Sequence, residues 1–122
     1  MANEIRTQLA QSVSNGSLND SISLAFQTDQ ATALLADGVQ IVGTSHEALN
    51  LGDVTNMGPS TIVNGDATNY VTLGIDDTGA FVPVLDIAPG EGLSGVKAAS
   101  GVTLYVKANT APVNIRRFIP SL

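Results

Sequence analysis

The sequence predicts an all-β fold, a single-domain antiparallel β-sandwich of about eight strands over residues 1–122, of jelly-roll or Greek-key type. Short apolar runs alternate with Gly, Pro, Asn and Asp turns from about Thr61 to Ile119. Residues 4–26 alternate polar and apolar side chains with the two-residue period of strands. A chain of 122 residues is long enough for one domain with its own core.

The N-terminal residues predict a hairpin. Residues 4–13 and 18–26 each read as a half-buried strand, and Asn15-Gly16 between them favours a tight turn because both residues accept positive φ. Residues 29–38 are ambiguous, since they contain good helix formers but are too short for a stable helix. A loop with one helical turn and a broken strand both fit this segment.

Further strands are expected along the rest of the chain. Thr44 to Glu47 has the spacing of a capping box, which predicts one local turn. Asp76 to Gly79 predicts a hairpin connection, with Asp side chains bonded to nearby amides and Gly79 at positive φ. The expected strands are 39–42, 61–64, 69–75, 80–87, 93–98, 102–108 and 113–119.

Pro83 marks the strand 80–87 as an edge strand or as a strand with a bulge, because proline cannot donate to a neighbouring strand. An edge strand can dock on another subunit. We therefore expect Val82, Pro83 and Val84 to be interface residues.

The composition predicts a surface that other subunits cover. Hydrophobic residues make up 43% of the chain and charged residues only 13%, against roughly 25% charged in an average soluble domain. A surface so poor in charge is disfavoured for a free monomer. A homo-oligomer is the expectation, and a weakly soluble monomer is the alternative.

The charge and the cysteine count restrict the possible partners and compartments. The formal charge is −6 and there is no basic stripe, which disfavours nucleic-acid binding. No apolar run approaches the roughly 18 to 20 residues that span a bilayer, and the first residues lack the apolar stretch of a secretory signal. We expect no membrane partner and a protein made in a cytoplasm. The absence of cysteine excludes disulfides and thiolate zinc sites.

Residues that could carry catalysis or ligand binding are few, and we expect no enzyme, no cofactor and no metal. His46 is the only histidine, and no G-x-S-x-G motif accompanies it. Asp76-Asp77-Thr78 could offer oxygen ligands to calcium, but turn chemistry explains the same residues. Glu91 lacks a carboxylate partner at catalytic spacing.

Sugar binding is the second chemistry that the sequence allows. The amides and hydroxyls of residues 64–69 could bond a sugar, although a polar hairpin turn explains them equally well. Sugar sites usually add an aromatic platform. We expect most of the five aromatic residues to face the core, which leaves sugar binding unsupported; they are Phe26, Tyr70, Phe81, Tyr105 and Phe118.

Arg116-Arg117 is the only local cluster of positive charge. Adjacent side chains in a strand point to opposite faces, so one arginine should turn inward to a carboxylate and the other outward. The outward arginine is the expected contact with an acidic partner subunit, and both residues are therefore candidate interface residues.

Several motifs together resemble those of small structural proteins from tailed-bacteriophage virions. They are Asn64-Gly65-Asp66-Ala67-Thr68-Asn69-Tyr70-Val71, Phe81-Val82-Pro83, Pro89-Gly90-Glu91 and Leu104-Tyr105-Val106-Lys107-Ala108. The likeness extends from the Asn15-Gly16 hairpin to the last strand. These motifs are structural, so they indicate kinship better than they indicate a role.

The resemblance implies a non-enzymatic component of the virion. The role it favours is a capsid decoration or cement protein that binds the major capsid protein on the outer shell and bridges neighbouring capsomers. A trimer would suit threefold positions of a shell. Two alternatives are a neck, tail or fibre-base subunit and, in another class, a carbohydrate-binding module for host attachment.

Overall fold

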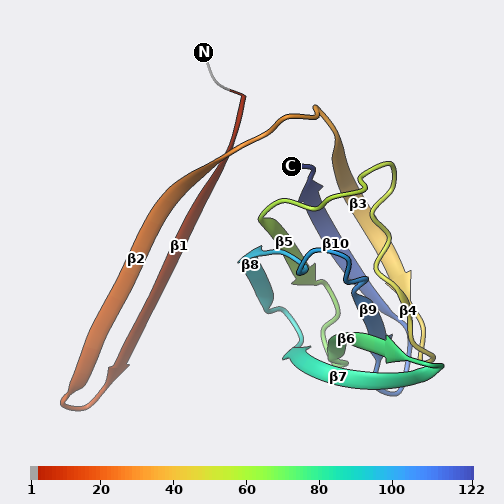
Figure 1. The fold of residues 1–122 in the computed structure, drawn as a ribbon. Coiled ribbons are helices and arrows are strands. Elements are labelled where there is room, and N and C mark those ends of the chain that lie inside the picture. The colour runs from red at the N-terminus through yellow and green to blue at the C-terminus, as the bar shows by residue number, and fades with distance from the viewer. Residues whose placement is uncertain (1–2) are drawn as a thin grey trace.

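The computed structural model describes residues 3–122, and this part of the chain contains ten strands and no helix. Figure 1 shows a long hairpin that projects from a two-layered body. The hairpin, called the arm below, consists of β1 (Glu4–Asn15) and β2 (Leu18–Asp29). The body contains β3 (Leu35–Val42), β4 (Glu47–Ala48), β5 (Ser60–Asn64), β6 (Val71–Asp77), β7 (Ala80–Ile87), β8 (Gly92–Val96), β9 (Tyr105–Ala108) and β10 (Val113–Pro120).

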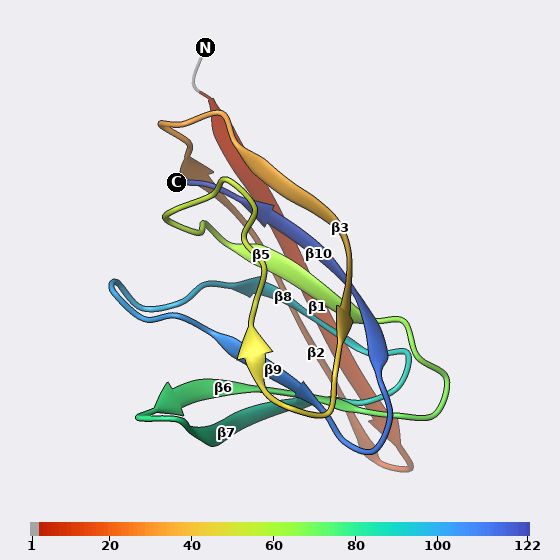
Figure 2. The ribbon, with the colours of Figure 1, turned by 90° about the vertical axis from the view of Figure 1, so that its right-hand side faces the viewer.

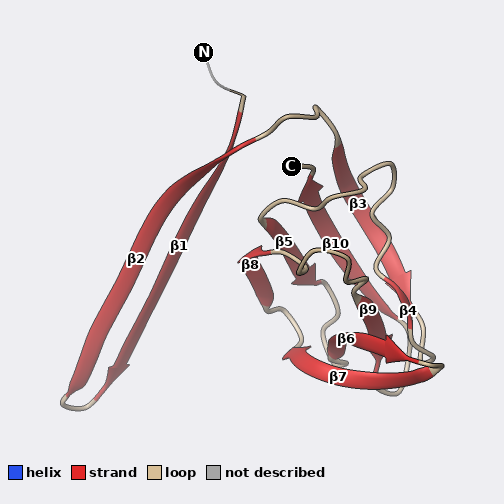
Figure 3. Ribbon diagram, in the orientation of Figure 1, coloured by secondary structure: helices blue, strands red, loops and turns tan. Residues whose placement is uncertain are grey.

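The body is a jelly roll. Its antiparallel pairs are nested, because β3 pairs with β10, β4 with β9, β5 with β8 and β6 with β7. Two further pairings, β10 with β5 and β6 with β9, complete the sheets β3-β10-β5-β8 and β4-β9-β6-β7 (Figures 2 and 3). This order arises when one long antiparallel hairpin folds over on itself. The predicted all-β sandwich of jelly-roll type is therefore confirmed, with eight strands in the body and two in the arm.

The core lies between the two sheets. Along β10 the side chains of Val113, Ile115 and Ile119 are fully buried, and the residues between them are mostly exposed, as the two-residue period of a strand requires. Each such Val or Ile contributes about 1.5–3 kcal/mol by leaving water. The buried apolar cluster comprises Ala36, Val42, Leu49, Val54, Met57, Ile62, Val71, Leu73, Ile87, Val106, Ala108, Val113, Ile115 and Ile119.

The first hairpin forms where the sequence predicts it. Asn15 pairs with Leu18 across the turn, and Gly16 has a φ of 60°. The pairing is unbroken from that turn to Glu4 and Asp29, so each strand has 12 residues and a length of about 40 Å. The alternation correctly predicts the two strands, but the hairpin extends outside the sandwich instead of joining a sheet.

Two local predictions need correction. The segment 29–38 contains no helical turn. A short loop follows β2 and leads into β3 at Leu35, so the broken strand is the better of the two alternatives. Residues 44–45 form a bend, but Glu47 does not cap it. Glu47 enters β4, and its Oε1 accepts a hydrogen bond from Gln40 Nε2 at 3.2 Å.

Strand β7 is both an edge strand and a bulged strand. It ends the sheet β4-β9-β6-β7, and its register against β6 shifts because Leu73 pairs with Leu85 whereas Gly74 pairs with Pro83. Val84 is the extra residue between these pairs. Both predictions from Pro83 are therefore confirmed, and the bulge lies opposite Gly74.

Gly74 is required by this bulge. A Cβ added to Gly74 would overlap the carbonyl oxygen of Val82 and lie 2.9 Å from the Phe81 ring. Backbone cannot move aside as a side-chain tip can, so the methyl group would have to displace β7 from β6.

We expect Gly74→Ala to lower the free energy of unfolding by about 3 kcal/mol, as overpacking of a tight site does. The matched control is Gly43→Ala, since nothing lies within 4 Å of a Cβ at Gly43. Urea denaturation of both variants measures the difference. Equal stability of the two variants would show that β7 is free to shift at the bulge.

Candidate functional site

Among the hollows on the body are a larger one beside the loop between β8 and β9 and a smaller one beside His46. The larger, of about 600 Å³, has Lys97 as its only ionisable lining side chain. The smaller, of about 520 Å³, contains the only histidine of the chain. It is lined by His46, Tyr70, Thr72, Gly79, Phe81, Pro83, Lys107, Ala108 and Asn109.

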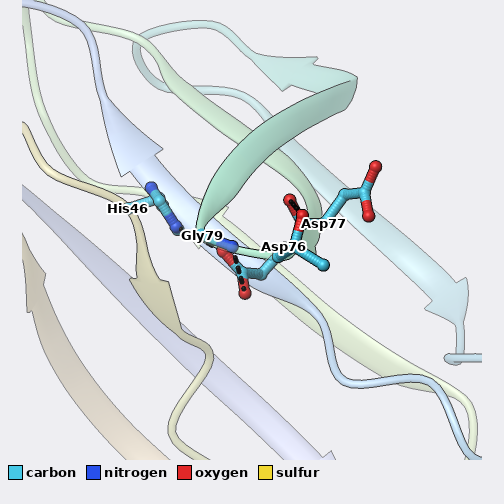
Figure 4. Close-up of polar contacts among 5 residues, drawn as sticks. His46, Asp76, Asp77 and Gly79 are labelled. Carbon is cyan, nitrogen blue, oxygen red and sulfur yellow. Dashed lines mark hydrogen bonds and ion pairs between the residues drawn. The ribbon is translucent and has the colours of Figure 1, made fainter.

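His46 is held in place on three sides. Its Nε2 donates to Asp76 Oδ1 at 2.8 Å, and the partner carboxylate lies at the end of β6 (Figure 4). The imidazole stacks on Phe81 with centroids 5.5 Å apart and lies tilted against Tyr105 at 5.6 Å. The other oxygen of Asp76 accepts from Gly79 N at 3.4 Å. These contacts fasten the loop before β4 to the β6–β7 turn.

The His46–Asp76 pair has the form of a general base with its orienting carboxylate, and acyl transfer would also need a nucleophile bonded to the imidazole. The aliphatic hydroxyl in the lining belongs to Thr72, and it donates to Asp86 Oδ1 at 2.8 Å instead; the other lining hydroxyl is the phenol of Tyr70. Glu91 lies exposed in the turn between β7 and β8. The contacts of His46 and Asp76 join the loop before β4 to the β6–β7 turn.

The two carboxylates of the β6–β7 turn do not converge. Asp77 points away from the His46–Asp76 pair in Figure 4, as neighbouring strand residues do. The hydroxyl of Thr78 donates to the Asp77 carbonyl at 2.8 Å, and Thr78 and Gly79 both have positive φ, as the predicted turn requires. No group of three or more potential metal-ligating side chains occurs within residues 3–122.

The polar loop 64–69 uses its hydrogen-bonding groups internally. Asn64 is fully buried, and its Nδ2 donates to the carbonyls of Asn69 at 2.9 Å and Ile87 at 3.0 Å. Its Oδ1 accepts from Asp66 N at 2.8 Å, and its backbone N donates to Glu91 O at 2.8 Å. The loop is therefore a turn built around Asn64. The predicted hairpin turn is wrong, because β5 and β6 on either side of the loop lie in different sheets.

Asp66 completes this turn. Its Oδ2 accepts from Asn69 N at 2.5 Å and from Thr68 N at 2.9 Å. These backbone bonds, first from Asn69 and then from Thr68, favour the carboxylate and hold the pKa of Asp66 below its usual value of 3.8.

A pKa that is lower in the folded state stabilises the fold above the unfolded value, and this contribution is lost as the pH falls through the folded value. We therefore expect Asp66→Asn to be less stable than the wild type at pH 6, with a gap that closes between about pH 4 and the acid limit of folding. Thermal unfolding across this pH range measures the gap. A gap that is constant with pH would mean that the charge of Asp66 does not matter.

The aromatic residues are not where the sequence suggests. None of the five is buried. Tyr70 and Phe118 are 42% and 44% exposed, and Phe26, Phe81 and Tyr105 are half-buried. The prediction that most of them face the core is wrong. Tyr70 and Phe81 instead line the hollow beside His46.

The predicted interface residues fall into two groups. Val82, Pro83 and Val84 are all exposed along the β7 edge, and Val84 at the bulge is 64% exposed. Arg116 points outward and forms an ion pair with Asp37 at 3.0 Å.

Arg117 is the inward arginine, 8% exposed, and this burial removes it from the outer surface. The prediction of opposite directions is confirmed. The predicted carboxylate partner is wrong, because Arg117 Nη1 donates to the carbonyl of Asn50, and its Nε has no partner among residues 3–122.

Two exposed apolar faces are the features that the sequence analysis missed. One is the arm face, formed by alternate residues of β1 and β2. The other is the sheet face, the outer side of β3-β10-β5-β8. The polar–apolar alternation in residues 4–26 indicates the apolar side of the arm, but alternation does not show whether that side is covered. The exposed apolar residues are Val13, Leu18, Ile22 and Leu24 on the arm and Leu35, Val39, Ile41, Val63 and Phe118 on the sheet.

No family model, curated protein or solved structure shows a significant match to this chain. Within residues 3–122 there is also no helix with the length and apolar character needed to cross a membrane.

Proposed function

We propose that this protein is a structural subunit of a bacteriophage virion, most specifically a capsid decoration protein that binds the major capsid protein and bridges neighbouring capsomers. The observation that carries this proposal is the apolar surface left open on a chain with only 13% charged residues. The arm face, the sheet face and the β7 edge together expose at least ten large apolar side chains. Monomeric proteins rarely leave contiguous surface of this kind uncovered.

The three surfaces lie on different parts of the molecule. The arm extends to one side of the body, the sheet face is the exterior of one layer, and the β7 edge terminates the other layer (Figures 1 and 2). A subunit that bridges capsomers needs more than one contact surface, and many weak contacts on a repeated lattice give strong attachment. This arrangement favours a bridging role over a single binary interface.

The polar groups support the same proposal. His46 and Asp76 clamp one loop, and Asn64 and Asp66 build another, so these side chains serve the fold. The jelly roll by itself does not specify a role, since the same fold carries many functions. The resemblance of the strand and turn motifs to virion proteins is what directs the proposal to a phage particle.

Copy number tests the proposal. Quantitative mass spectrometry of purified particles from the source should find this chain at hundreds of copies, on the scale of the major capsid protein. A dozen or so copies would indicate a neck, tail or fibre-base subunit instead. Absence from the particles would contradict a virion role altogether.

The β7 edge gives a second test. Val84→Lys should weaken binding to particles about tenfold or more, because a docked strand edge cannot accommodate the ammonium group, yet it should change stability by less than about 0.5 kcal/mol because Val84 is exposed. Co-sedimentation with particles and urea denaturation measure the two effects. Val82→Lys should act in the same direction.

The matched control is Val102→Lys, which alters a valine of 43% exposure in the loop before β9. We expect this variant to bind like the wild type. Equal weakening by both lysines would indicate a general effect of added charge, and equal loss of binding and stability at Val84 would place that side chain in the monomer core.

A further inference from the structure

The arm has one apolar and one polar side. The register pairs odd-numbered residues of β1 with even-numbered residues of β2, so these residues share one face. That arm face consists of Ile5, Thr7, Leu9, Gln11, Val13, Asn15, Leu18, Asp20, Ile22, Leu24, Phe26 and Thr28. The opposite face carries Glu4, Arg6, Gln8, Ala10, Ser12, Ser14, Asn19, Ser21, Ser23, Ala25, Gln27 and Asp29.

The base of the arm face is already packed against the body. Ile5 and Thr7 are each 8% exposed. A Cβ at Gly58 would lie 2.7 Å from Ile5 Cδ1, and a Cβ at Gly95 of β8 would lie 3.3 Å from Leu9 Cδ2. The two glycines thus leave room for the arm. The face that the body covers at the base is the same face that lies open further along.

The distal part of the arm face is exposed. Val13, Leu24, Leu18 and Ile22 are 44%, 55%, 56% and 70% exposed, respectively. A two-stranded ribbon is at best marginally stable in water unless a third layer or strand covers it. An arm of about 40 Å with one apolar side therefore needs a cover over this distal part.

The sheet face offers a matching surface. Val39 and Ile41 of β3 are 61% and 68% exposed, and Phe118 of β10 is 44% exposed. The sheet β3-β10-β5-β8 is the layer of the body nearer to the arm, since the arm lies behind this sheet in Figure 2 and to its left in Figure 1. The exposures show that the arm leaves this face of its own body largely open.

Each of the two faces has few charged side chains, and an exposed arginine on one could meet an exposed carboxylate on the other. Asp20 is the only ionisable residue of the arm face and bonds only to the neighbouring amide of Ser21. The sheet face carries Arg116, whose side chain is 64% exposed and whose cross-strand neighbours are Val39 and Val63. Its guanidinium meets Asp37 and has room for a second carboxylate. The sheet face thus has one cation, Arg116, beside its own anion, Asp37, and Asp20 would be a second carboxylate for the exposed guanidinium.

We propose that the distal arm of one copy lies on the sheet face of a second copy of this chain, with Asp20 near Arg116. Within one copy the base of the arm packs against the edge strand β8 of this sheet, where Leu9 lies beside Gly95, but Val39 and Ile41 of β3 and Phe118 of β10 stay exposed. Arm and sheet face are different patches, so docking can repeat head-to-tail, and it gives a ring such as the expected trimer when the rotation closes. The inference goes beyond the proposed function, because it holds for any particle that this chain builds.

The chain has no cysteine, so thiol cross-linking in solution tests the contact directly. Full-length Ile22→Cys is mixed with mass-tagged full-length Val39→Cys and treated with a short bismaleimide. The charge pairing places these positions together, since Ile22 follows Asp20 by two residues on the same face and Val39 pairs with Arg116. We expect a cross-linked heterodimer. The control is Ser23→Cys with Val39→Cys, which should give none because Ser23 lies on the opposite face of the arm.

Three results would overturn the proposal. Cross-linking only within the double variant Ile22→Cys/Val39→Cys would show the arm on its own sheet. Dimers of Ile22→Cys alone, in preference to the mixed pair, would show arms paired with each other. If no mixture gives a cross-linked product, the arm does not bind the sheet face of a second copy, and another partner such as the capsid shell would cover it. Copy number in particles is measured separately, so failure here and failure of the virion role are distinguishable.

Charge-reversal variants test the proposed contact between Asp20 and Arg116. Asp20→Arg and Arg116→Asp should each weaken self-association about tenfold or more, and the double variant should recover most of the loss because the pair is restored with opposite signs. Sedimentation velocity measures the association. Additive weakening in the double variant would overturn the proposed contact between Asp20 and Arg116.

Discussion

The buried amide of Asn64 secures the place where the chain crosses between the two sheets. Strand β5 ends at Asn64 and the chain passes to β6 in the other layer, and β7 ends at Ile87 before the chain returns as β8. Asn64 bonds to both crossings, to Asn69 in the first and to Ile87 in the second. Leaving such buried carbonyls without a partner would cost about 1–3 kcal/mol each. The nested pairing of the jelly roll depends on these two crossings remaining in place.

Polar side chains that could have served a binding site are instead bonded to neighbouring loops and strands. The side chains that looked chemically versatile in the sequence, His46 and the loop 64–69, hold loops to strands. The exterior then differs from that of an ordinary soluble domain, because it has few charges and several exposed apolar stretches. The proposed particle role and the proposed arm contact both rest on these exposed surfaces.

Features that depend on neighbouring residues could be read from the sequence. The Asn15-Gly16 turn and the positive φ of Gly79 follow from backbone freedom, and the edge position of β7 follows from the missing amide of Pro83. The periodicity predicted every strand except β4 to within a few residues. The helical turn in 29–38 was wrongly allowed as an alternative, because helix propensity is a weak guide where tertiary pairing can draw residues into a strand such as β3.

The amino-acid sequence by itself determined an all-β chain, its main turns and the opposite directions of Arg116 and Arg117. Only the tertiary structure decided the nested strand order, the position of the first hairpin outside the sandwich and the meeting of His46 with Asp76. These features join residues far apart in the chain, 30 positions in the case of that pair. Alternation shows that a strand has an apolar side, but strand pairing and packing decide whether the core covers that side or, as in the arm, leaves it exposed.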